Sequence, residues 1–222
     1  MTEPGGEVAL RSAEGRERAT AADLLARAFE FDPLIAATTS SVEHPHEARA
    51  AIFRASIDGT LLAGGDLVLA ERLGVVIGAA LIADPSGGTL ARAARANAAR
   101  LVSGARFLSL ARRLATGALT LLNDADRASR RLAPPHPHHV LVAVGVDAAA
   151  RGLGVGRLLV EHAVQRARTD SRSWGVRLET ENPHNVDRYA RWGFSLLGVV
   201  PTGGVDVHVM ARATHDEQEQ VR

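Results

Sequence analysis

The sequence predicts an α/β (α+β) fold in which helices flank a central sheet and a helical insertion precedes the central strand. Three observations predict it. The chain of 222 residues is 46% hydrophobic and 23% charged, which is the balance of a folded domain. Strand-like and helix-like segments alternate along it. The run HHVLVAVGV, residues 138–146, is a continuous β-forming segment suited to a strand that is buried on both faces.

The N-terminal half is expected to start with a strand and two helices and to end with a hairpin. Apolar residues recur at helical spacing after Thr20, and a Gly/Pro-rich turn over 84–88 closes the unit. The expected elements are a strand over 8–11, a helix with Thr20 as N-cap that runs through Phe29 and is broken by Pro33, a helix over 46–57 that ends at Gly59, and antiparallel strands over 67–71 and 73–83.

The C-terminal half alternates strands and helices. Apolar residues of 154–169 repeat at helical spacing, and Pro183 suits the first turn of the next helix. The expected elements are strands over 138–146, 174–180, 194–200 and 205–210, helices over 154–169 and 183–192, and a polar tail over 214–222. Residues 1–213 are therefore expected to form a single domain.

The insertion, about residues 89–131, is the least usual segment. Its part from Thr89 to Asn123 carries six arginines and no acidic residue, with leucines and Phe107 on the apolar side, and we expect two helices broken near Ser103 and Gly104. A basic amphipathic helix can lie on a membrane or bind nucleic acid. The interpretation that we favour is a pair of helices covering one end of the sheet.

Composition excludes several classes of function. The chain has no cysteine, so disulfides, zinc–thiolate sites and thiol nucleophiles are excluded. All 26 Lys+Arg residues are arginine, which excludes a Walker-type phosphate loop and lysine Schiff-base chemistry and is typical of a GC-rich bacterial genome. The net charge of +1 gives no drive towards nucleic acid. No apolar run reaches the roughly 18–20 residues of a membrane span, and no secretory signal is evident, so we expect a cytoplasmic protein that acts without membrane or nucleic acid.

Residues 142–159, VAVGVDAAARGLGVGRLL, carry the most informative pattern. A buried strand leads through a turn into a helix that is opened by a glycine-rich segment. Glycine lets the backbone come close to a ligand, and the amides and dipole of a helix N-terminus suit an anionic phosphate. The segment that we expect to cradle a pyrophosphate consists of Arg151, Gly152, Leu153, Gly154, Val155, Gly156 and Arg157.

A dinucleotide fingerprint G-x-G-x-x-G starting at Gly152 would need glycine where Arg157 stands. The pattern R-G-x-G-x-G instead resembles the pyrophosphate loop of the GCN5-related N-acetyltransferase (GNAT) family. A second segment, L-E-T at 178–180 followed by N-P-H-N at 182–185, Tyr189 and G-F at 193–194, is similar to the part of that family which flanks the cofactor thiol. The insertion and the L-E-T strand look most like the puromycin N-acetyltransferase subgroup.

The resemblance implies a mixed, mostly antiparallel sheet and an enzyme that transfers acetyl directly from acetyl-CoA to a primary amine of a small molecule. It implies that Asn185 contacts coenzyme A and that Tyr189, the single tyrosine of the chain, protonates the leaving thiolate. Backbone N–H groups of Val144, Gly145 and Val146 would face the developing oxyanion where the central strand splays from its neighbour.

Alternatives remain for each of these assignments. Tyr189 can be a packing aromatic, and Glu179 can be a general base or a structural hydrogen-bond acceptor. His138 and His139 are adjacent on a strand and so point to opposite faces, which disfavours a shared metal ion and leaves one of them free to face the acceptor pocket. A non-catalytic acyl-CoA sensor and a peptide or protein N-acetyltransferase are the competing functions, with a monomer or homodimer as the expected state.

The acceptor pocket is expected to lie on the side of the sheet opposite the cofactor. Its expected walls are the insertion with Phe107, Leu108 and Leu110, the N-terminal helices around 29–34, and the strand at 140–144.

Overall fold

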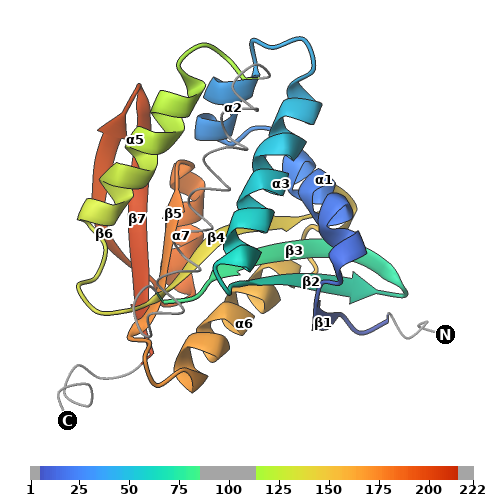
Figure 1. Cartoon of the computed structure of the whole chain (residues 1–222). Helices are drawn as coiled ribbons and strands as arrows, with labels where there is room; N and C mark the ends of the chain where they lie inside the picture. The colour runs from blue at the N-terminus through green and yellow to red at the C-terminus, as the bar shows by residue number, and fades with distance from the viewer. Residues whose placement is uncertain (1–5, 86–113, 215–222) are drawn as a thin grey trace.

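A seven-stranded sheet runs through the part of the chain that the computed structural model describes, residues 6–85 and 114–214 (Figure 1). The strand order is β1-β2-β3-β4-β5-β7-β6, and only the β4–β5 pair is parallel. The strands are β1 (Ala9–Ser12), β2 (Asp66–Arg72), β3 (Val75–Ala83), β4 (His139–Val146), β5 (Gly175–Thr180), β6 (Ser195–Thr202) and β7 (Val205–Ala213). This mixed, mostly antiparallel sheet confirms the expected fold class.

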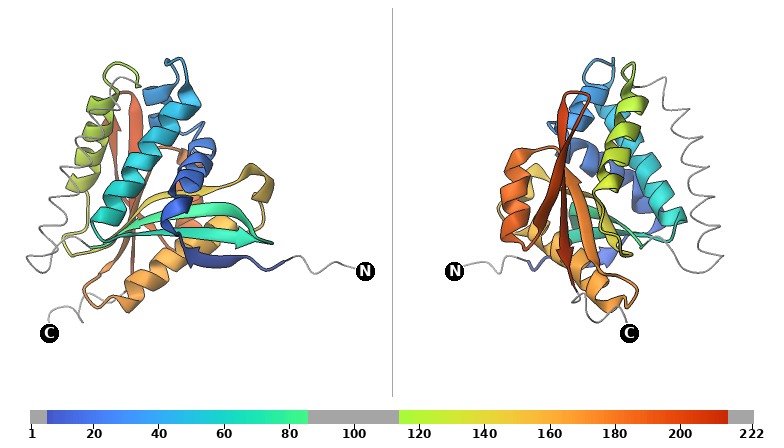
Figure 2. Two further views of the ribbon diagram at one scale, coloured as in Figure 1. Left: turned by 45° about the vertical axis from the view of Figure 1, so that its right-hand side comes forward. Right: turned by 90° about the vertical axis from the view of Figure 1, so that its left-hand side faces the viewer.

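Helices cover both faces of the sheet (Figure 2). On one face lie α1 (Arg18–Ala28), α2 (Pro33–Thr39), α3 (Pro45–Leu62) and α5 (Ala118–Arg131), and on the other lie α6 (Val155–Thr169) and α7 (Pro183–Arg191). Leu25 of α1 and Leu81 of β3 belong to the first buried cluster, and Leu159 of α6 and Leu178 of β5 to the second. Because side chains alternate along each strand, the sheet separates two apolar cores.

The centre of the sheet opens between β4 and β5. Their parallel pairing is limited to the register from His139 with Val176 to Leu141 with Leu178, although both strands continue. The expected splay is therefore present, but it opens directly after Leu141 rather than near Gly145. A register shift in the β3–β4 pairing gives the physical reason: Leu81 faces Ala143 while Ile82 faces Leu141, and such a bulge bends the strand that carries the extra residue.

The N-terminal helices differ from the sequence prediction. Thr20 lies inside α1 and is not its N-cap. The short helix η1 (Gly15–Glu17) directly precedes α1 and begins with a capping box formed by Glu14 and Glu17. Pro33 begins α2, a helix that we did not predict. The Asp32 carboxylate accepts the Ile35 N–H at 3.0 Å as the N-cap of that helix, and proline suits its first turn.

Helix α3 runs past Gly59 to Leu62, so the predicted end was wrong. The glycine that follows the true end is Gly64, whose φ of +99° is the left-handed conformation common after a helix C-terminus. The hairpin of β2 and β3 is confirmed, with Leu73 and Gly74 at positive φ in a two-residue turn. The remaining elements end within three residues of the predicted bounds.

Only the end of the insertion is described. Helix α5 packs Ala125 against Val207 and Val209 of β7, with Leu34 at the edge of the same cluster. The expected break near 103–104 and the apolar residues Phe107, Leu108 and Leu110 lie outside the described residues, as does the tail over 215–222.

Candidate functional site

The glycine-rich segment forms the turn from β4 into α6, as expected. Gly152 and Gly154 adopt positive φ, +84° and +77°, and Gly154 is the N-cap of α6. A Cβ atom at either position would meet nothing within 4 Å, so the backbone borders open space. The first bond of the helix runs from the Leu158 N–H to the Gly154 carbonyl, which leaves the preceding N–H groups of the helix start without partners inside it.

These features fit an anionic phosphate group. Leu153, Arg151 and Arg157 are exposed around the turn, and neither arginine forms an ion pair with another described residue. Free amides, the positive end of the helix dipole and two unpaired guanidinium groups all favour negative charge at the same place. Val155 is buried against the sheet and anchors the turn, while a Cβ atom added at Gly156 would meet Val146 and Trp192 at ordinary contact distance.

The splay exposes one edge of β4. The Asp147 N–H donates to Ile77 of β3 at 2.9 Å, and in an antiparallel pair the backbone groups of successive residues alternate in direction. The N–H of Gly145 is therefore turned towards β3, whereas those of Val144 and Val146 are turned towards the splay. Two of the three expected backbone donors thus have the expected direction, and Gly145 does not.

A large cleft lies on the face of the sheet that carries α2, α3 and α5. Its volume is about 1470 Å³, and its lining includes Phe29, Leu34, Val140 and Val144 from the expected walls. From the described end of the insertion, Leu119 and Leu122 of α5 also line it. None of residues 145–157 does, so the glycine-rich turn and the cleft are separate places that meet at the splay.

Tyr189 stands at this meeting point, on α7. Only 8% of its surface is exposed, and its ring packs edge-on against Trp192 and Phe194 with ring centroids 5.6 and 5.9 Å away. It also lines the cleft, and its hydroxyl has no hydrogen-bond partner among the described residues. Burial raises the pKa of Tyr189 to about 12, so the phenol keeps its proton at any physiological pH. The packing role and a role as proton donor are therefore compatible.

Glu179 lines the same cleft but is engaged. Its carboxylate accepts a hydrogen bond of 2.7 Å from Arg177, two residues earlier on β5, and that guanidinium also donates to Ser129 of α5. Arg177 is buried, so the ion pair balances a charge that would otherwise be costly. This geometry favours the structural interpretation of Glu179.

Two carboxyl groups that the sequence analysis missed lie at the cleft near Tyr189. Asp32 comes from the N-cap of α2, and Glu181 from the junction of β5 and α7. Both pKa values are raised, chiefly by burial, and the charges of the two groups act on each other. For Glu181, burial and the nearby charges of Asp32 and Glu179 raise the pKa to about 8. The sequence offered one signal for Glu181. It directly follows β5, two positions after Glu179, and side chains two residues apart on an extended chain point to the same face.

Asn182 and Asn185 fix the start of α7. The Asn182 side chain caps the helix by accepting the His184 N–H at 3.0 Å, as expected. Asn185 donates to the Thr180 hydroxyl at 3.2 Å and accepts from Arg188 at 2.6 Å. It also lines the cleft, as Tyr189 does.

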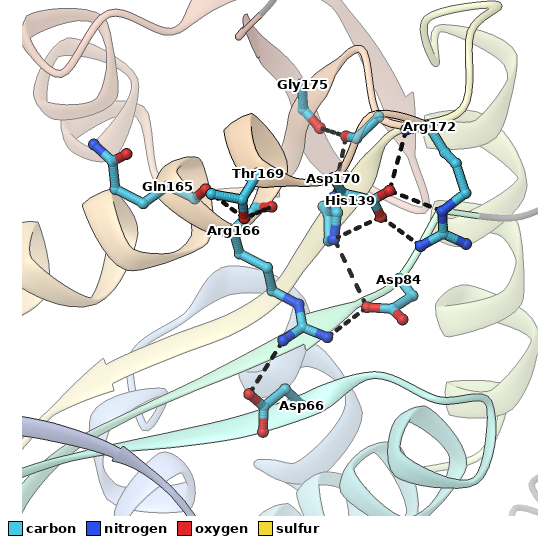
Figure 3. A network of polar contacts seen from close by, with 10 residues as sticks. Asp66, Asp84, His139, Gln165, Arg166, Thr169, Asp170, Arg172 and Gly175 are labelled. Carbon is cyan, nitrogen blue, oxygen red and sulfur yellow. Dashed lines mark hydrogen bonds and ion pairs between the residues drawn. The ribbon is translucent and has the colours of Figure 1, made fainter.

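His138 and His139 point to opposite faces, as the sequence predicts. His138 lines the cleft, with its Nδ1 2.7 Å from the His136 carbonyl, and burial lowers its pKa. His139 is buried on the face of α6 in a polar network of its own (Figure 3). Its Nδ1 lies 3.1 Å from the Ser173 hydroxyl, and its Nε2 lies 3.7 Å from Asp84 and 3.8 Å from Asp170. His139 therefore has no access to the cleft.

A family model described as the acetyltransferase (GNAT) family matches residues 32–194. The chain belongs to the GNAT acetyltransferase family. It is therefore an acyltransferase, and GNAT acetyltransferases use acetyl-CoA and take an acceptor substrate. The match covers α2 to α7 and so includes the glycine-rich turn, the splay and Tyr189.

Solved structures share the GNAT fold over nearly the whole chain. A histone acetyltransferase HPA2 and related acetyltransferase from Corynebacterium glutamicum is 23% identical, with a TM-score of 0.65 over 95% of this chain and 98% of that one. The putative acetyltransferase yncA from Salmonella typhimurium, solved with its cofactor acetyl-CoA, is 17% identical with a TM-score of 0.55, over 95% and 96%. The ribosomal-protein-alanine N-acetyltransferase from Brucella melitensis is 17% identical with a TM-score of 0.53, over 92% and 99%. The comparison with curated proteins found no match.

None of the described helices of this GNAT protein combines the length and the apolar character needed to cross a bilayer.

Proposed function

We propose that the protein transfers the acetyl group of acetyl-CoA directly to a primary amine of a small molecule. The observation that carries the proposal is the cleft of about 1470 Å³, because it reaches Tyr189 and the open edge of β4 from the face opposite α6. The cleft exceeds the roughly 300–1,000 Å³ of an ordinary small-molecule site, so it has ample room for a small organic acceptor. The acyl donor and the acceptor would then approach the same point from two sides of the sheet.

Different residues of the chain would have different roles in this reaction. The amides of 152–157, with Arg151 and Arg157 beside them, would hold the pyrophosphate of coenzyme A, and Asn185 would contact the cofactor near its thiol end. The cofactor supplies an activated thioester. The backbone N–H groups of Val144 and Val146 would stabilise the oxyanion, and Tyr189 would give its proton to the departing sulfur. A phenol with a pKa of about 12 is fully protonated at neutral pH and so available as a donor.

Acceptors of the aminonucleoside and aminoglycoside kinds are the first to test, because the insertion before β4 supports the likeness to the puromycin N-acetyltransferase subgroup. Peptide N-termini are the second kind, since a neighbour of the same fold bears the name ribosomal-protein-alanine N-acetyltransferase. Thiol release from acetyl-CoA with each amine measures turnover directly. If acetyl-CoA binds but no amine of either kind causes thiol release, the sensor interpretation would be supported instead.

Replacing Tyr189 with phenylalanine tests the assigned acid. We expect the turnover number to fall by about a hundredfold or more, because a positioned proton donor commonly contributes that much, while the affinity for acetyl-CoA changes little. Thiol-release kinetics and calorimetric binding separate the two effects. Unchanged turnover with a rate-limiting chemical step would leave Tyr189 as a packing residue.

Replacing Gly154 with valine tests the pyrophosphate cradle. Valine would be strained at the φ of +77° and would place its side chain in the open space that the ligand needs, so acetyl-CoA binding should be lost. Gly204→Val is the matched control, because Gly204 has a φ of +86°, also borders open space and lies in the distant β6–β7 turn. Equal binding by the two variants would refute the cradle.

A further inference from the structure

Helix α7 carries Tyr189 but has almost no apolar face that could hold the helix in place. Of its nine residues, only Tyr189 is buried, and Val186 is partly buried against the same cluster. Most surface helices are positioned by a broad apolar stripe that packs on the core. Because α7 lacks such a stripe, its position, and with it the position of the phenol, depends on the contacts that hold its two ends.

The C-terminal end of α7 forms a Schellman motif in which Tyr189 takes part directly. The Gly193 N–H donates to the Ala190 carbonyl and the Phe194 N–H donates to the Tyr189 carbonyl, each at 3.0 Å. Gly193 has a φ of +84°, the left-handed conformation that this motif uses after a helix. The Phe194 ring also packs on the ring of Tyr189, with centroids 5.9 Å apart. A movement of this helix end therefore moves the phenol.

Arg212 of β7 bonds the carbonyl at the C-cap of this helix, which has no partner within α7. Its Nη1 donates to the Trp192 carbonyl at 2.8 Å and to the Glu161 carboxylate of α6, also at 2.8 Å. A Cβ atom at Gly193 would lie 3.3 Å from Arg212 Nε, so the guanidinium lies over that glycine. A cation is favourable at the negative end of a helix dipole, and its hydrogen bonds are strengthened by its charge. These two bonds form the Arg212 bridge, which ties the end of α7 to α6.

The side chain of Trp192 provides a second link between the end of α7 and α6. A Cβ atom at Gly156, in the first turn of α6, would meet the Trp192 ring at 3.9 Å. The same ring packs edge-on against Tyr189, with centroids 5.6 Å apart. Because α6 begins at the glycine-rich turn, both links connect the phenol to the place where we expect the pyrophosphate of the cofactor.

We propose that Arg212 is a positioning residue for Tyr189: its bridge between the C-cap carbonyl of α7 and Glu161 of α6 fixes the phenol relative to the start of α6. The inference rests on the proposed function, in which Tyr189 gives its proton to the sulfur of a cofactor held at that helix start. Arg212 does not line the cleft and acts through the end of α7. Among the hydrogen bonds of the described residues, those of Arg212 join the end of α7 to α6.

The bridge should affect turnover more than stability. The side chains of Arg212 and Glu161 are 22% and 32% exposed, and ion pairs that water reaches contribute little to the free energy of unfolding. Catalysis is far more sensitive to position, because a displacement of about 1 Å in a reacting group can cost about a hundredfold in rate. A loss of turnover without a comparable loss of stability is therefore the expected sign of a positioning role.

The kinetic test is a double-mutant cycle of Arg212→Met and Tyr189→Phe, measured by thiol release and by calorimetric binding of coenzyme A. Arg212→Met alone should lower the turnover number about tenfold or more, because a misplaced proton donor slows the chemical step. The dissociation constant of coenzyme A should change by less than about threefold. In the Tyr189→Phe background, the same substitution should cost less than about twofold in turnover, since Arg212 acts through a phenol that is already absent.

Matched variants separate positioning from general stability. Arg212→Lys keeps a cation with hydrogens for both partners and should recover at least part of the turnover. Arg11→Met is the control, because Arg11 bridges Glu17 and Glu71 in the same manner at the β1 edge of the sheet, and it should leave turnover unchanged. If Arg212→Met does not fold, Glu161→Leu breaks the bridge from the α6 side and should give a smaller loss with the same dependence on Tyr189.

Nuclear magnetic resonance tests the bridge without turnover. Tyr189 is the single tyrosine of the chain, so protein labelled with ring-¹³C tyrosine gives the signals of one ring. The Trp192 and Phe194 rings shift these signals, and in Arg212→Met we expect them to move towards those of a hydrated tyrosine and to return in part in Arg212→Lys. Unchanged ring signals in Arg212→Met, or an undiminished loss of turnover in the Tyr189→Phe background, would each overturn the proposal. Moved ring signals together with no thiol release for any amine would refute the proposed acetyl transfer and leave the bridge in place.

Discussion

The two faces of the sheet each carry a cluster of acidic residues near the β4–β5 junction, and the clusters are balanced in different ways. Beneath β4, Arg166 donates to Asp84 at 2.8 Å and to Asp66 at 3.5 Å, while Arg172 pairs with Asp170 (Figure 3). Each carboxylate of this His139 network has a guanidinium partner. Across the sheet, no guanidinium partner of Asp32 or Glu181 is found among the described residues, and burial raises the pKa values of both carboxyl groups.

The difference teaches how to distinguish a structural acidic cluster from one available to a ligand. In the His139 network every negative charge is already compensated, and its side chains line only a small, shallow site of about 290 Å³. Asp32 and Glu181 border a large cleft, where a ligand can reach them. A compensated cluster contributes to stability, whereas a protonated one lowers stability when it ionises.

Removing the cation from the His139 network should cause the largest loss of stability. Arg166→Leu leaves Asp84 and Asp66, both mostly buried, without that partner, and we expect a loss of about 3 kcal/mol in the free energy of unfolding at pH 7. Urea denaturation measures it. Arg168→Leu, an exposed arginine on the same helix, is the control, and equal losses in both variants would show that the network is not compensated as described.

Glu181→Gln should shift stability in the opposite direction at pH 9, by at most about 5 kcal/mol, since each pKa unit corresponds to about 1.4 kcal/mol. The folded pKa of about 8 lies above the ordinary value of 4.5, so the proton stabilises the fold below pH 4.5 and this contribution is lost as the pH rises through 8. Glutamine removes that loss. We expect the Tm of the variant to exceed that of the wild type at pH 9 and to match it at pH 4.5. Parallel Tm-versus-pH curves from pH 4.5 to 9.5 would contradict the raised pKa.

The smallest effect is expected for an ion pair that belongs to neither cluster. Asp126 and Arg130 lie one turn apart on α5, and both side chains are at least half exposed. Asp126→Asn should cost about 0.3–0.5 kcal/mol, because water and salt screen such pairs. Urea denaturation at low and at 0.5 M salt checks it. A loss as large as that of Arg166→Leu would mean that exposure does not distinguish surface ion pairs from the ion pairs of the His139 network.

The sequence predicted most of the elements because their signals are local. The buried run into β4, the glycines that open α6 and the proline that begins α7 each act within a few residues, and the structure places all three as expected. Helix α2 was missed because Asp32 and Pro33 were interpreted as the end of one helix, whereas an N-cap followed by proline also begins one. The long α3 was cut short since a glycine inside a helix and one after it look alike in sequence.

The candidate site could be predicted only in part, for a physical reason. Tyr189 and the turn at 151–157 belong to continuous segments whose sequence pattern identifies them. The pairing of Asp32 with Glu181 depends on how α2 meets the end of β5 across the cleft, and no local pattern determines that approach. The same holds for Arg177, whose burial and whose bond to Ser129 arise from the packing of α5.

The short pairing of β4 with β5 makes a central strand behave as an edge strand along half its length. Amide hydrogen exchange should record this as an alternation: protected amides at Ala143 and Gly145, which are turned towards β3, and rapidly exchanging ones at Val144 and Val146, which are turned towards the splay. Free strand edges usually invite pairing with other chains. Here the edge lies inside the molecule, with α1 and α6 packed against β4, so these helices restrict the approach of another protein's strand.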